Sequence, residues 1–217
     1  MTAVLFDMDG VLVDSESYWV PLENEEILPK VVPDQDVRAD EITGMNYREI
    51  YDYLDEHYGT AVDREEFLDV FDEAAHEIFG ERAALFPVLS DLLAELADRE
   101  VPVGMVTSSP TSWIDVVFDR FDLHDAFEVV VSADERDFDG KPEPHVYEYA
   151  AQLLDVDPVD CVVVEDSSHG IEAAHRAGTF VIGFRFGGDP GDGPADVVID
   201  SPEALRETVL AQVDERA

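Results

Sequence analysis

Two carboxylates stand two residues apart where the first apolar run of the chain ends. The run covers residues 3–6, and Asp7 and Asp9 follow it in the sequence FDMDG. Residues i and i+2 of an extended chain point the same way, so these two side chains converge just beyond the run. Nearby carboxylates repel each other, and one must take up a proton unless both share a cation. The pair therefore predicts acid–base chemistry or a metal site, with an ordinary turn at Asp9-Gly10 as the alternative.

Further polar residues follow other apolar, β-prone runs: Thr107 and Ser108 after residues 101–106, Lys141 beyond residues 127–131, and Glu165 with Asp166 after residues 161–164. In an open α/β sheet, ligands bind outside the carboxyl ends of the strands. We therefore expect one site assembled from four separated segments. Each member also has a structural alternative: Thr107 and Ser108 as caps of the next helix, Lys141 as a solvated surface charge, and Glu165 with Asp166 as ordinary acids.

These residue types suit phosphoryl transfer. A carboxylate can attack phosphorus to form an aspartyl-phosphate, and we assign this role to Asp7. A second carboxyl, Asp9, would protonate the leaving oxygen and later take a proton from water. The charge on the transferred group would be stabilised by the hydroxyl of Thr107, by backbone N–H groups near Ser108 and by Lys141.

The acidic residues of this set also predict a site for a divalent cation. A hard cation with oxygen ligands would let the carboxylate of Asp7 approach an anionic phosphate. Asp166 is the expected further ligand, with Glu165 beside it and Asp9 sharing the ion. The six histidines show no zinc-site spacing and are interpreted as structural.

The elements that must position these residues alternate between strands and helices. We expect strands at residues 3–6, 101–107, 127–131, 161–165, 180–184 and 196–199, and helices at 87–100, 112–123, 144–155 and 170–178. This alternation predicts an α/β fold with a doubly wound parallel sheet. The glycine-rich residues 186–194 lack a strand–glycine–helix context and are interpreted as a turn.

Residues 16–85 interrupt this alternation, because they carry helical periodicity and no convincing strand. One apolar stripe comprises Tyr47, Ile50, Tyr51, Leu54 and Tyr58, and another comprises Phe67, Val70, Phe71, Ala74, Ala75 and Ile78. Asp63 with Glu66 three residues later predicts a capping box at the second helix. We expect a helical insertion after the first strand, with hinges at residues 14–17 and at Phe86-Pro87.

Composition limits the partners of the chain. Its 217 residues include 52 acidic and 13 basic residues, for a formal net charge of -39. Nucleic acid and anionic membranes are therefore unfavourable partners. The acids are spread along the chain, which favours a solvated acidic surface suited to a salt-rich cytoplasm, with a basic partner as the alternative. We expect a cytoplasmic protein, because the single cysteine, Cys161, permits no internal disulfide and neither a signal peptide nor a membrane-spanning run is evident.

The chain resembles the haloacid dehalogenase superfamily phosphatases that carry a helical cap. Four sequences match the family motifs in order: FDMDGVLVDS, VTSS, GKPEP and VVVEDSSHGIEAAHRAG. The resemblance implies a Mg²⁺-dependent phosphohydrolase with a Rossmann-like core at residues 1–15 and 86–217 and a cap at 16–85. It also implies that Asp7 is the nucleophile and Asp9 the acid/base. The dehalogenases proper lack that second aspartate, so dehalogenation is disfavoured.

Within this superfamily, the substrate class stays open at the level of sequence. Similar proteins cleave small phosphorylated metabolites such as phosphoglycolate or sugar phosphates, and we expect a monomer or weak dimer. The alternative is a phosphosugar mutase of the β-phosphoglucomutase type, but Trp19 occupies the position of the mutase histidine and Arg48 lies one residue from that of the cap arginine. Trp19 could equally be core packing. A module that binds a divalent cation without turnover is a further alternative.

Overall fold

The computed structural model describes residues 1–135, 139–185 and 193–216, and the described strands form one parallel sheet. The spatial order is β3-β2-β1-β4-β5-β6. The strands are β1 (Ala3–Phe6), β2 (Val103–Thr107), β3 (Val129–Ser132), β4 (Cys161–Glu165), β5 (Phe180–Phe184) and β6 (Val197–Ile199). The predicted doubly wound α/β fold is confirmed. Most of the glycine-rich segment interpreted as a turn, residues 186–192, lies outside the described residues.

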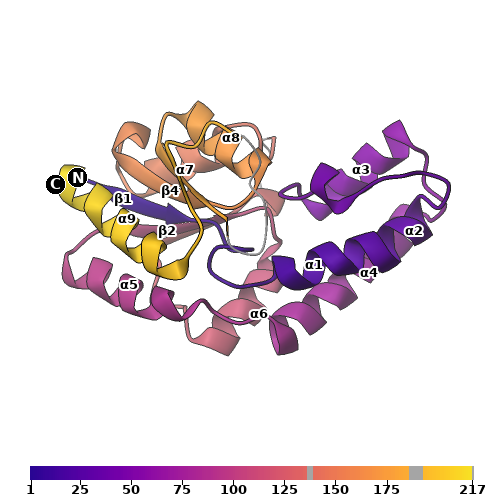
Figure 1. Ribbon diagram of the computed structural model, residues 1–217, viewed down its shortest axis with the longest axis horizontal. Coiled ribbons are helices and arrows are strands. Elements are labelled where there is room, and N and C mark those ends of the chain that lie inside the picture. The colour runs from indigo at the N-terminus through magenta and orange to yellow at the C-terminus, as the bar shows by residue number, and fades with distance from the viewer. Residues whose placement is uncertain (136–138, 186–192, 217) are drawn as a thin grey trace.

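Helices cover both faces of the sheet (Figure 1). They are α5 (Pro87–Asp98), α6 (Thr111–Phe121), α7 (His145–Leu153), α8 (Ser168–Ala177) and α9 (Pro202–Arg216). The strand β1 is buried on both sides: Leu5 belongs to the apolar cluster formed with α7 and α8, and Phe6 belongs to the cluster formed with α5 and α9. Such two-sided burial explains why the run at residues 3–6 is continuously apolar.

Two details of the core differ from expectation. The strands β2 and β3 begin two residues later than predicted, at Val103 and Val129. The residue before β2 is Pro102, which has no N–H for the sheet. The helix α9 was not predicted, although Leu205, Val209 and Val213 recur at helical spacing and are buried.

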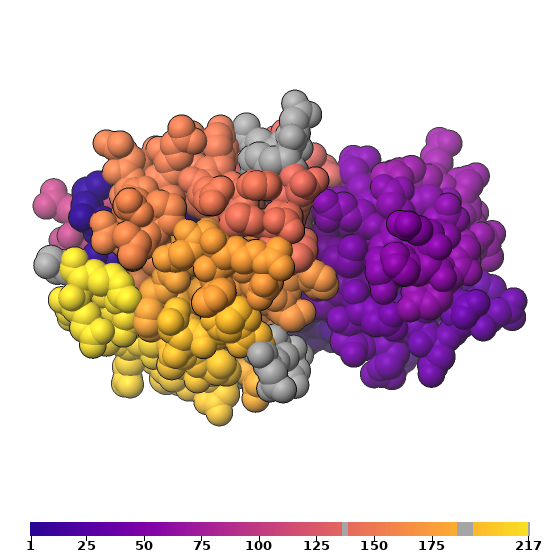
Figure 2. All heavy atoms as spheres, turned by 90° about the horizontal axis from the view of Figure 1, so that it is seen from above, coloured from indigo at the N-terminus to yellow at the C-terminus, as the bar shows by residue number. Residues whose placement is uncertain are grey.

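The segment between β1 and α5 folds into helices and contains no named strand, as the periodicity predicts. Its elements are α1 (Glu16–Leu22), the π-helical η1 (Glu23–Ile27), α2 (Leu28–Val31), the 3-10 turn η2 (Ala39–Glu41), α3 (Tyr47–His57), α4 (Arg64–Glu77) and the π-helical η3 (Ile78–Arg82). This helical insertion forms a lobe beside the sheet domain (Figures 1 and 2). The two apolar stripes of α3 and α4 pack into the same cluster.

The start of α4 confirms one half of the predicted capping box. The side chain of Asp63 accepts a hydrogen bond of 2.9 Å from the backbone N–H of Glu66. The carboxylate of Glu66 instead pairs with Lys30 at 2.8 Å.

The insertion is joined to the sheet domain by two chain segments that lie side by side. Backbone hydrogen bonds link Asp14 to Ala84 at 2.9 Å and Phe86 to Leu12 at 3.1 Å. The helical lobe is thus attached near β1 through two chain segments that hydrogen-bond to each other. Within the described residues, no helix is both long and apolar enough to cross a membrane.

Candidate active site

The parallel sheet brings the predicted residues together at the carboxyl ends of its strands. The strand β1 lies between β2 and β4, so Asp7 after β1, Thr107 at the end of β2 and Glu165 at the end of β4 are neighbours. A cavity of about 80 Å³ opens at these strand ends. Its lining includes six predicted residues: Asp7, Asp9, Thr107, Ser108, Lys141 and Asp166. Glu165 is fully buried and lies outside this lining.

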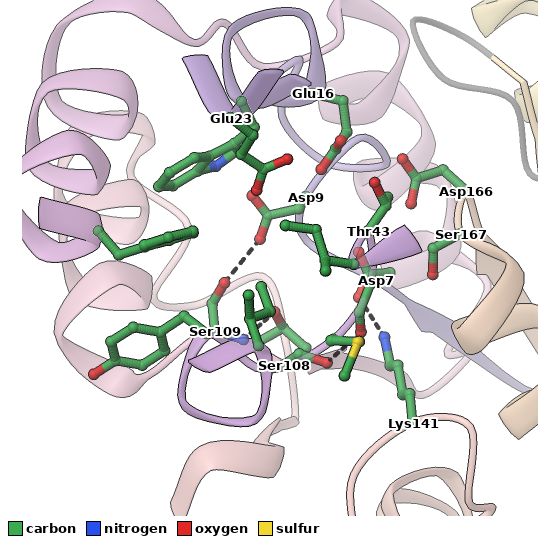
Figure 3. Close-up of a pocket in the computed structure, with 18 of the residues that line it drawn as sticks. Asp7, Asp9, Glu16, Glu23, Thr43, Ser108, Ser109, Lys141, Asp166 and Ser167 are labelled. Carbon is green, nitrogen blue, oxygen red and sulfur yellow. Dashed lines mark hydrogen bonds and ion pairs between the residues drawn. The ribbon is translucent and has the colours of Figure 1, made fainter. Parts of the chain in front are cut away.

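Lys141 is the centre of a buried charge network at the floor of this pocket. Its ammonium donates to Asp7 Oδ1 at 2.6 Å (Figure 3). It also donates to Glu165 Oε1, and its side chain is only 2% exposed. Burial alone would lower the pKa of Lys141, but the charges of Asp7 and Glu165 outweigh it and raise that pKa above its usual value. The alternative of a solvated surface lysine is therefore wrong.

Glu165 is held by donors on both of its carboxylate oxygens. Besides Lys141, Oε1 accepts from the hydroxyl of Tyr147 at 2.6 Å. The other oxygen accepts from the backbone N–H groups of Asp166 and Ser167 at 3.1 and 3.3 Å, and from the Ser167 hydroxyl at 3.2 Å. Because its acceptor positions are used in this way, Glu165 fixes Lys141 and the start of α8 in place.

Three buried carboxylates meet closely enough to share a cation. One oxygen each from Asp7, Glu165 and Asp166 lies within 4.8 Å of the others. Burial, followed by the charge of Glu16, raises the pKa of Asp166 well above its usual range. Gly10 adopts a left-handed φ of +66°, and a Cβ there would lie 1.8 Å from Asp166 Oδ2. The site thus concentrates negative charge in a space that only glycine leaves open, and this donor set fits a hard divalent cation.

Asp9 belongs to the same pocket but not to that three-carboxylate group. One oxygen accepts a hydrogen bond of 2.8 Å from the hydroxyl of Ser109 (Figure 3). The other accepts one of 2.8 Å from the hydroxyl of Ser15. Burial raises the pKa of Asp9, although hydrogen bonds from Ser15, Ser109 and Trp19 oppose the shift. A carboxyl with a raised pKa that faces a pocket is suited to carry a proton.

The segment after β2 connects the two lobes rather than capping the following helix. Thr107 Oγ1 accepts from the backbone N–H of Ser109 at 3.0 Å, while the Ser108 hydroxyl donates to the carbonyl of Gly44 in the insertion at 3.1 Å. The N-cap residue of α6 is Pro110, without a side-chain cap. The alternative of Thr107 and Ser108 as helix caps is therefore wrong for α6.

The helical insertion supplies a second wall that the sequence analysis did not identify. Glu16, Glu23, Thr43, Tyr47 and Phe71 line the pocket from this side, together with Trp19. Glu16 and Glu23 extend toward the region of Asp9 (Figure 3). Burial, and then the charge of Asp9, raises the pKa of Glu16 to about 8. Burial also raises the pKa of Glu23 well above its usual range, with the charge of Glu16 next.

Trp19 combines the two roles that the sequence left open. Its ring stacks between Phe71 and Trp113, with centroid distances of 5.6 and 5.7 Å. It also lines the pocket with Asp9, whose pKa it lowers. An indole N–H only donates, so Trp19 cannot relay a proton.

Arg48 lies outside the pocket lining, whereas the preceding Tyr47 is part of it. The Arg48 guanidinium donates to Asp134 at 2.9 Å, next to Asn46, whose amide donates to the same carboxylate at 3.0 Å. Asp134 belongs to η4 (Ala133–Glu135) of the sheet domain. Arg48 thus links the two lobes instead of facing a ligand.

Comparisons with known proteins agree with this geometry. A family model described as haloacid dehalogenase-like hydrolase matches residues 4–184. Hexitol phosphatase B of Escherichia coli (strain K12) is 30% identical, over 81% of this chain and 79% of its own. The beta-phosphoglucomutase of Bacillus subtilis (strain 168) is 28% identical, over 84% and 83%. Among solved structures, CbbY from Rhodobacter sphaeroides in complex with phosphate is 26% identical, covers 99% of this chain and 100% of that chain, and has a TM-score of 0.77.

Proposed function

This chain belongs to the haloacid dehalogenase-like hydrolase family, and we propose that it is a Mg²⁺-dependent phosphatase of small phosphate monoesters, of the sugar phosphate or phosphoglycolate type. The observation that carries the proposal is the position of Asp7. It ends β1 beside the buried Lys141 and shares its pocket with a second carboxyl, Asp9. The hexitol phosphatase relative supports a phosphorylated carbohydrate as substrate.

In the first step, Asp7 attacks the phosphorus through the oxygen that is not bonded to Lys141. A bond forms between this oxygen and phosphorus, the ester P–O bond breaks, and Asp9 gives its proton to the leaving oxygen. Lys141, Thr107 and Ser108 line the pocket, and their ammonium and N–H groups would stabilise the charge of the transferred group.

In the second step, Asp9 acts as a base. It takes a proton from a water molecule, whose oxygen attacks the phosphorus and releases Asp7 and inorganic phosphate. The hydroxyls of Ser15 and Ser109 hold Asp9 in one orientation through both steps.

We assign the Mg²⁺ site to Asp7 and Asp166, with Asp9 as a predicted additional partner and Glu165 holding the surrounding groups. When bound there, the cation would offset the repulsion between the carboxylates and an incoming phosphate. The cluster of Asp7, Glu165 and Asp166 supports this assignment, because three buried carboxylates with no cation other than Lys141 among their hydrogen-bond partners favour a further positive charge.

The second candidate is a phosphosugar mutase, which the beta-phosphoglucomutase relative favours. A mutase must return the phosphoryl group to bound sugar without losing it to water. Trp19 occupies the position predicted for the mutase histidine, and Arg48, one residue from the position of the cap arginine, pairs with Asp134. With β-glucose 1-phosphate and catalytic glucose 1,6-bisphosphate, we expect phosphate release; glucose 6-phosphate formed faster than phosphate would establish the mutase instead.

A phosphate-release screen tests the proposal. Small monoesters, including glucitol 6-phosphate, glycerol 3-phosphate and p-nitrophenyl phosphate, are incubated with and without Mg²⁺ at high salt. We expect Mg²⁺-dependent release from several of them. Mg²⁺ binding by calorimetry without any turnover would instead identify a module that only binds a divalent cation.

The acidic composition supports a halophilic, cytoplasmic setting without nucleic-acid or membrane partners, and we retain a monomer or weak dimer as part of this proposal. A net charge of -39 repels itself when screening is weak. Raising salt from about 0.1 M to about 1 M shortens the Debye length from about 10 to about 3 Å. The midpoint of thermal unfolding should rise over this range, and equal midpoints in dilute buffer and molar KCl would contradict the halophilic assignment.

A further inference from the structure

Glu23 carries a buried carboxyl group that faces the pocket without a partner among the residues that the structure describes. It is 7% exposed and lines the cavity. Its carboxylate makes no hydrogen bond or ion pair to any residue within 1–135, 139–185 and 193–216. A buried polar group without a bond costs free energy, so an unbonded carboxylate at a pocket wall marks a place where a ligand supplies the partner.

The position of Glu23 relates it to the leaving group. Its carboxylate lies near Asp9, which we assign to protonate the leaving oxygen (Figure 3). The two groups are near enough for the charge of Asp9 to act on Glu23. Atoms adjacent to the leaving oxygen of the substrate would therefore come within reach of Glu23 and of the neighbouring Glu16.

This wall offers hydrogen-bond acceptors and no cation. Among the described residues that line the pocket, Lys141 is the one cationic side chain, and it is engaged at the floor by Asp7 and Glu165. A second anionic group on the substrate would be taken out of water here beside two carboxyl groups and would find no cation to pair with. A hydroxyl, in contrast, donates to an ionised carboxyl group and accepts from a protonated one, so it can bond Glu23 and Glu16 in either state.

We infer that the substrates are monophosphates of uncharged polyols or sugars, whose hydroxyls hydrogen-bond Glu23 and Glu16, and that esters carrying a carboxylate or a second phosphate are rejected. This inference rests on the proposed phosphatase function and decides between the two substrate types named there. It favours sugar phosphates and excludes phosphoglycolate. Trp19, Tyr47 and Trp113 line the rest of this wall with aromatic surface that suits the C–H faces of a sugar.

Matched substrate pairs test the inference. Glycerol 3-phosphate and 3-phosphoglycerate differ by one CH₂OH that is replaced by a carboxylate, as do glucitol 6-phosphate and 6-phosphogluconate. We expect kcat/KM to be at least about ten-fold higher for the alcohol in at least one pair, a discrimination typical of a site that binds a hydroxyl beside unpaired polar groups. Equal or faster hydrolysis of both acids would overturn the inference.

Two variants assign this discrimination to Glu23. Glu23→Gln keeps the shape but replaces the carboxyl group by an amide that cannot ionise and whose N–H donates to an anion, so it should reduce the alcohol-to-acid ratio several-fold. Glu25→Gln makes the same replacement at an exposed residue of the same π-helical segment and should leave the ratio unchanged. A ratio that is equal in wild type and Glu23→Gln, or that falls equally in both variants, would overturn the role of Glu23.

The panel also separates the inference from its premise. p-Nitrophenyl phosphate has neither hydroxyls nor a carboxylate on its leaving group and reports phosphatase chemistry alone. If it is hydrolysed while the acids are preferred over the alcohols, only the inference fails. If no ester is hydrolysed with Mg²⁺ present, the proposed function fails and the inference with it.

Discussion

The floor and the roof of the pocket differ in how their charges are paired. At the floor, Lys141 bonds Asp7 and Glu165, and Glu165 is further held by Tyr147 and the backbone. At the roof, the wall formed by the helical insertion, the carboxyl groups of Glu16 and Glu23 face the cavity with no hydrogen bond to a described residue. A preorganised network suits a group that is the same in every substrate, the phosphoryl group. Unbonded acceptors suit the variable part, the alcohol. The difference suggests that chemistry resides in the sheet domain and selectivity in the helical insertion.

Loss of the floor nucleophile should have the largest effect. Asp7→Asn keeps the size of the side chain but removes the nucleophilic oxygen, so kcat should fall by about 10³-fold or more. Phosphate release under single-turnover conditions measures it. Asp14→Asn, in the same segment but outside the pocket lining, is the control and should retain activity. Activity of Asp7→Asn near that of wild type would show that Asp7 is not the nucleophile.

Removing a proposed cation ligand should have the next largest effect. Asp166→Asn deletes one of the three carboxylates that converge at the floor. The Mg²⁺ concentration for half-maximal activity should rise at least about ten-fold. Calorimetric titration of Mg²⁺ provides a second readout, and Asp160→Asn at the opposite end of β4 is the matched control. An unchanged Mg²⁺ affinity would remove Asp166 from the site.

The link between the lobes should have a smaller effect, confined to substrate binding. The ion pair of Arg48 with Asp134 is partly exposed, with 47% of the Arg48 side chain accessible, and such pairs contribute up to about 1 kcal/mol. Arg48→Ala should therefore raise KM by less than about five-fold with little change in kcat. Arg64→Ala, which breaks a pair with Asp52 inside the insertion, should leave KM unchanged. A large drop in kcat for Arg48→Ala would place Arg48 in the chemistry instead.

Glu23 in the roof should also have a small effect on how the stability of the protein depends on pH. Burial raises the pKa of Glu23 in the folded state, so the folded protein holds this proton more tightly than the unfolded chain does. Wild-type stability should therefore decrease as pH rises from the unfolded value, about 4.3, through the higher folded pKa. Glu23→Gln lacks this loss. In EDTA, its melting temperature relative to wild type should increase with pH and then level off, and a pH-independent difference would contradict the shift.

The same contrast explains what could be predicted from sequence. The floor residues end apolar strands, and parallel strands bring their carboxyl ends together, so Asp7, Thr107 and Glu165 could be grouped without coordinates. Lys141 was identifiable because it is one of two lysines and lies between glycine and proline. These signals are local in the chain and need no knowledge of helix packing.

The roof could not be predicted in this way. Glu23 lies in the run ENEE, and periodicity alone does not tell which of these acids turns inward once the helix widens to a π-helical turn. Ser109 was missed because its bond to Asp9 joins residues 100 positions apart. Trp19 could be placed in the core or in the site, and it serves both, which a single pattern cannot express.

The covalent role of Asp7 is the central claim, and trapping the phosphoryl-enzyme tests it most directly. p-Nitrophenolate leaves without needing a proton, so Asp9→Asn should complete the first step with p-nitrophenyl phosphate and stall before water attacks. After an acid quench, mass spectrometry should find one added phosphoryl group on the peptide that contains Asp7. The same experiment with Asp7→Asn should find none. Turnover by Asp9→Asn with no added phosphoryl group, or a phosphoryl group on any other residue, would contradict the account.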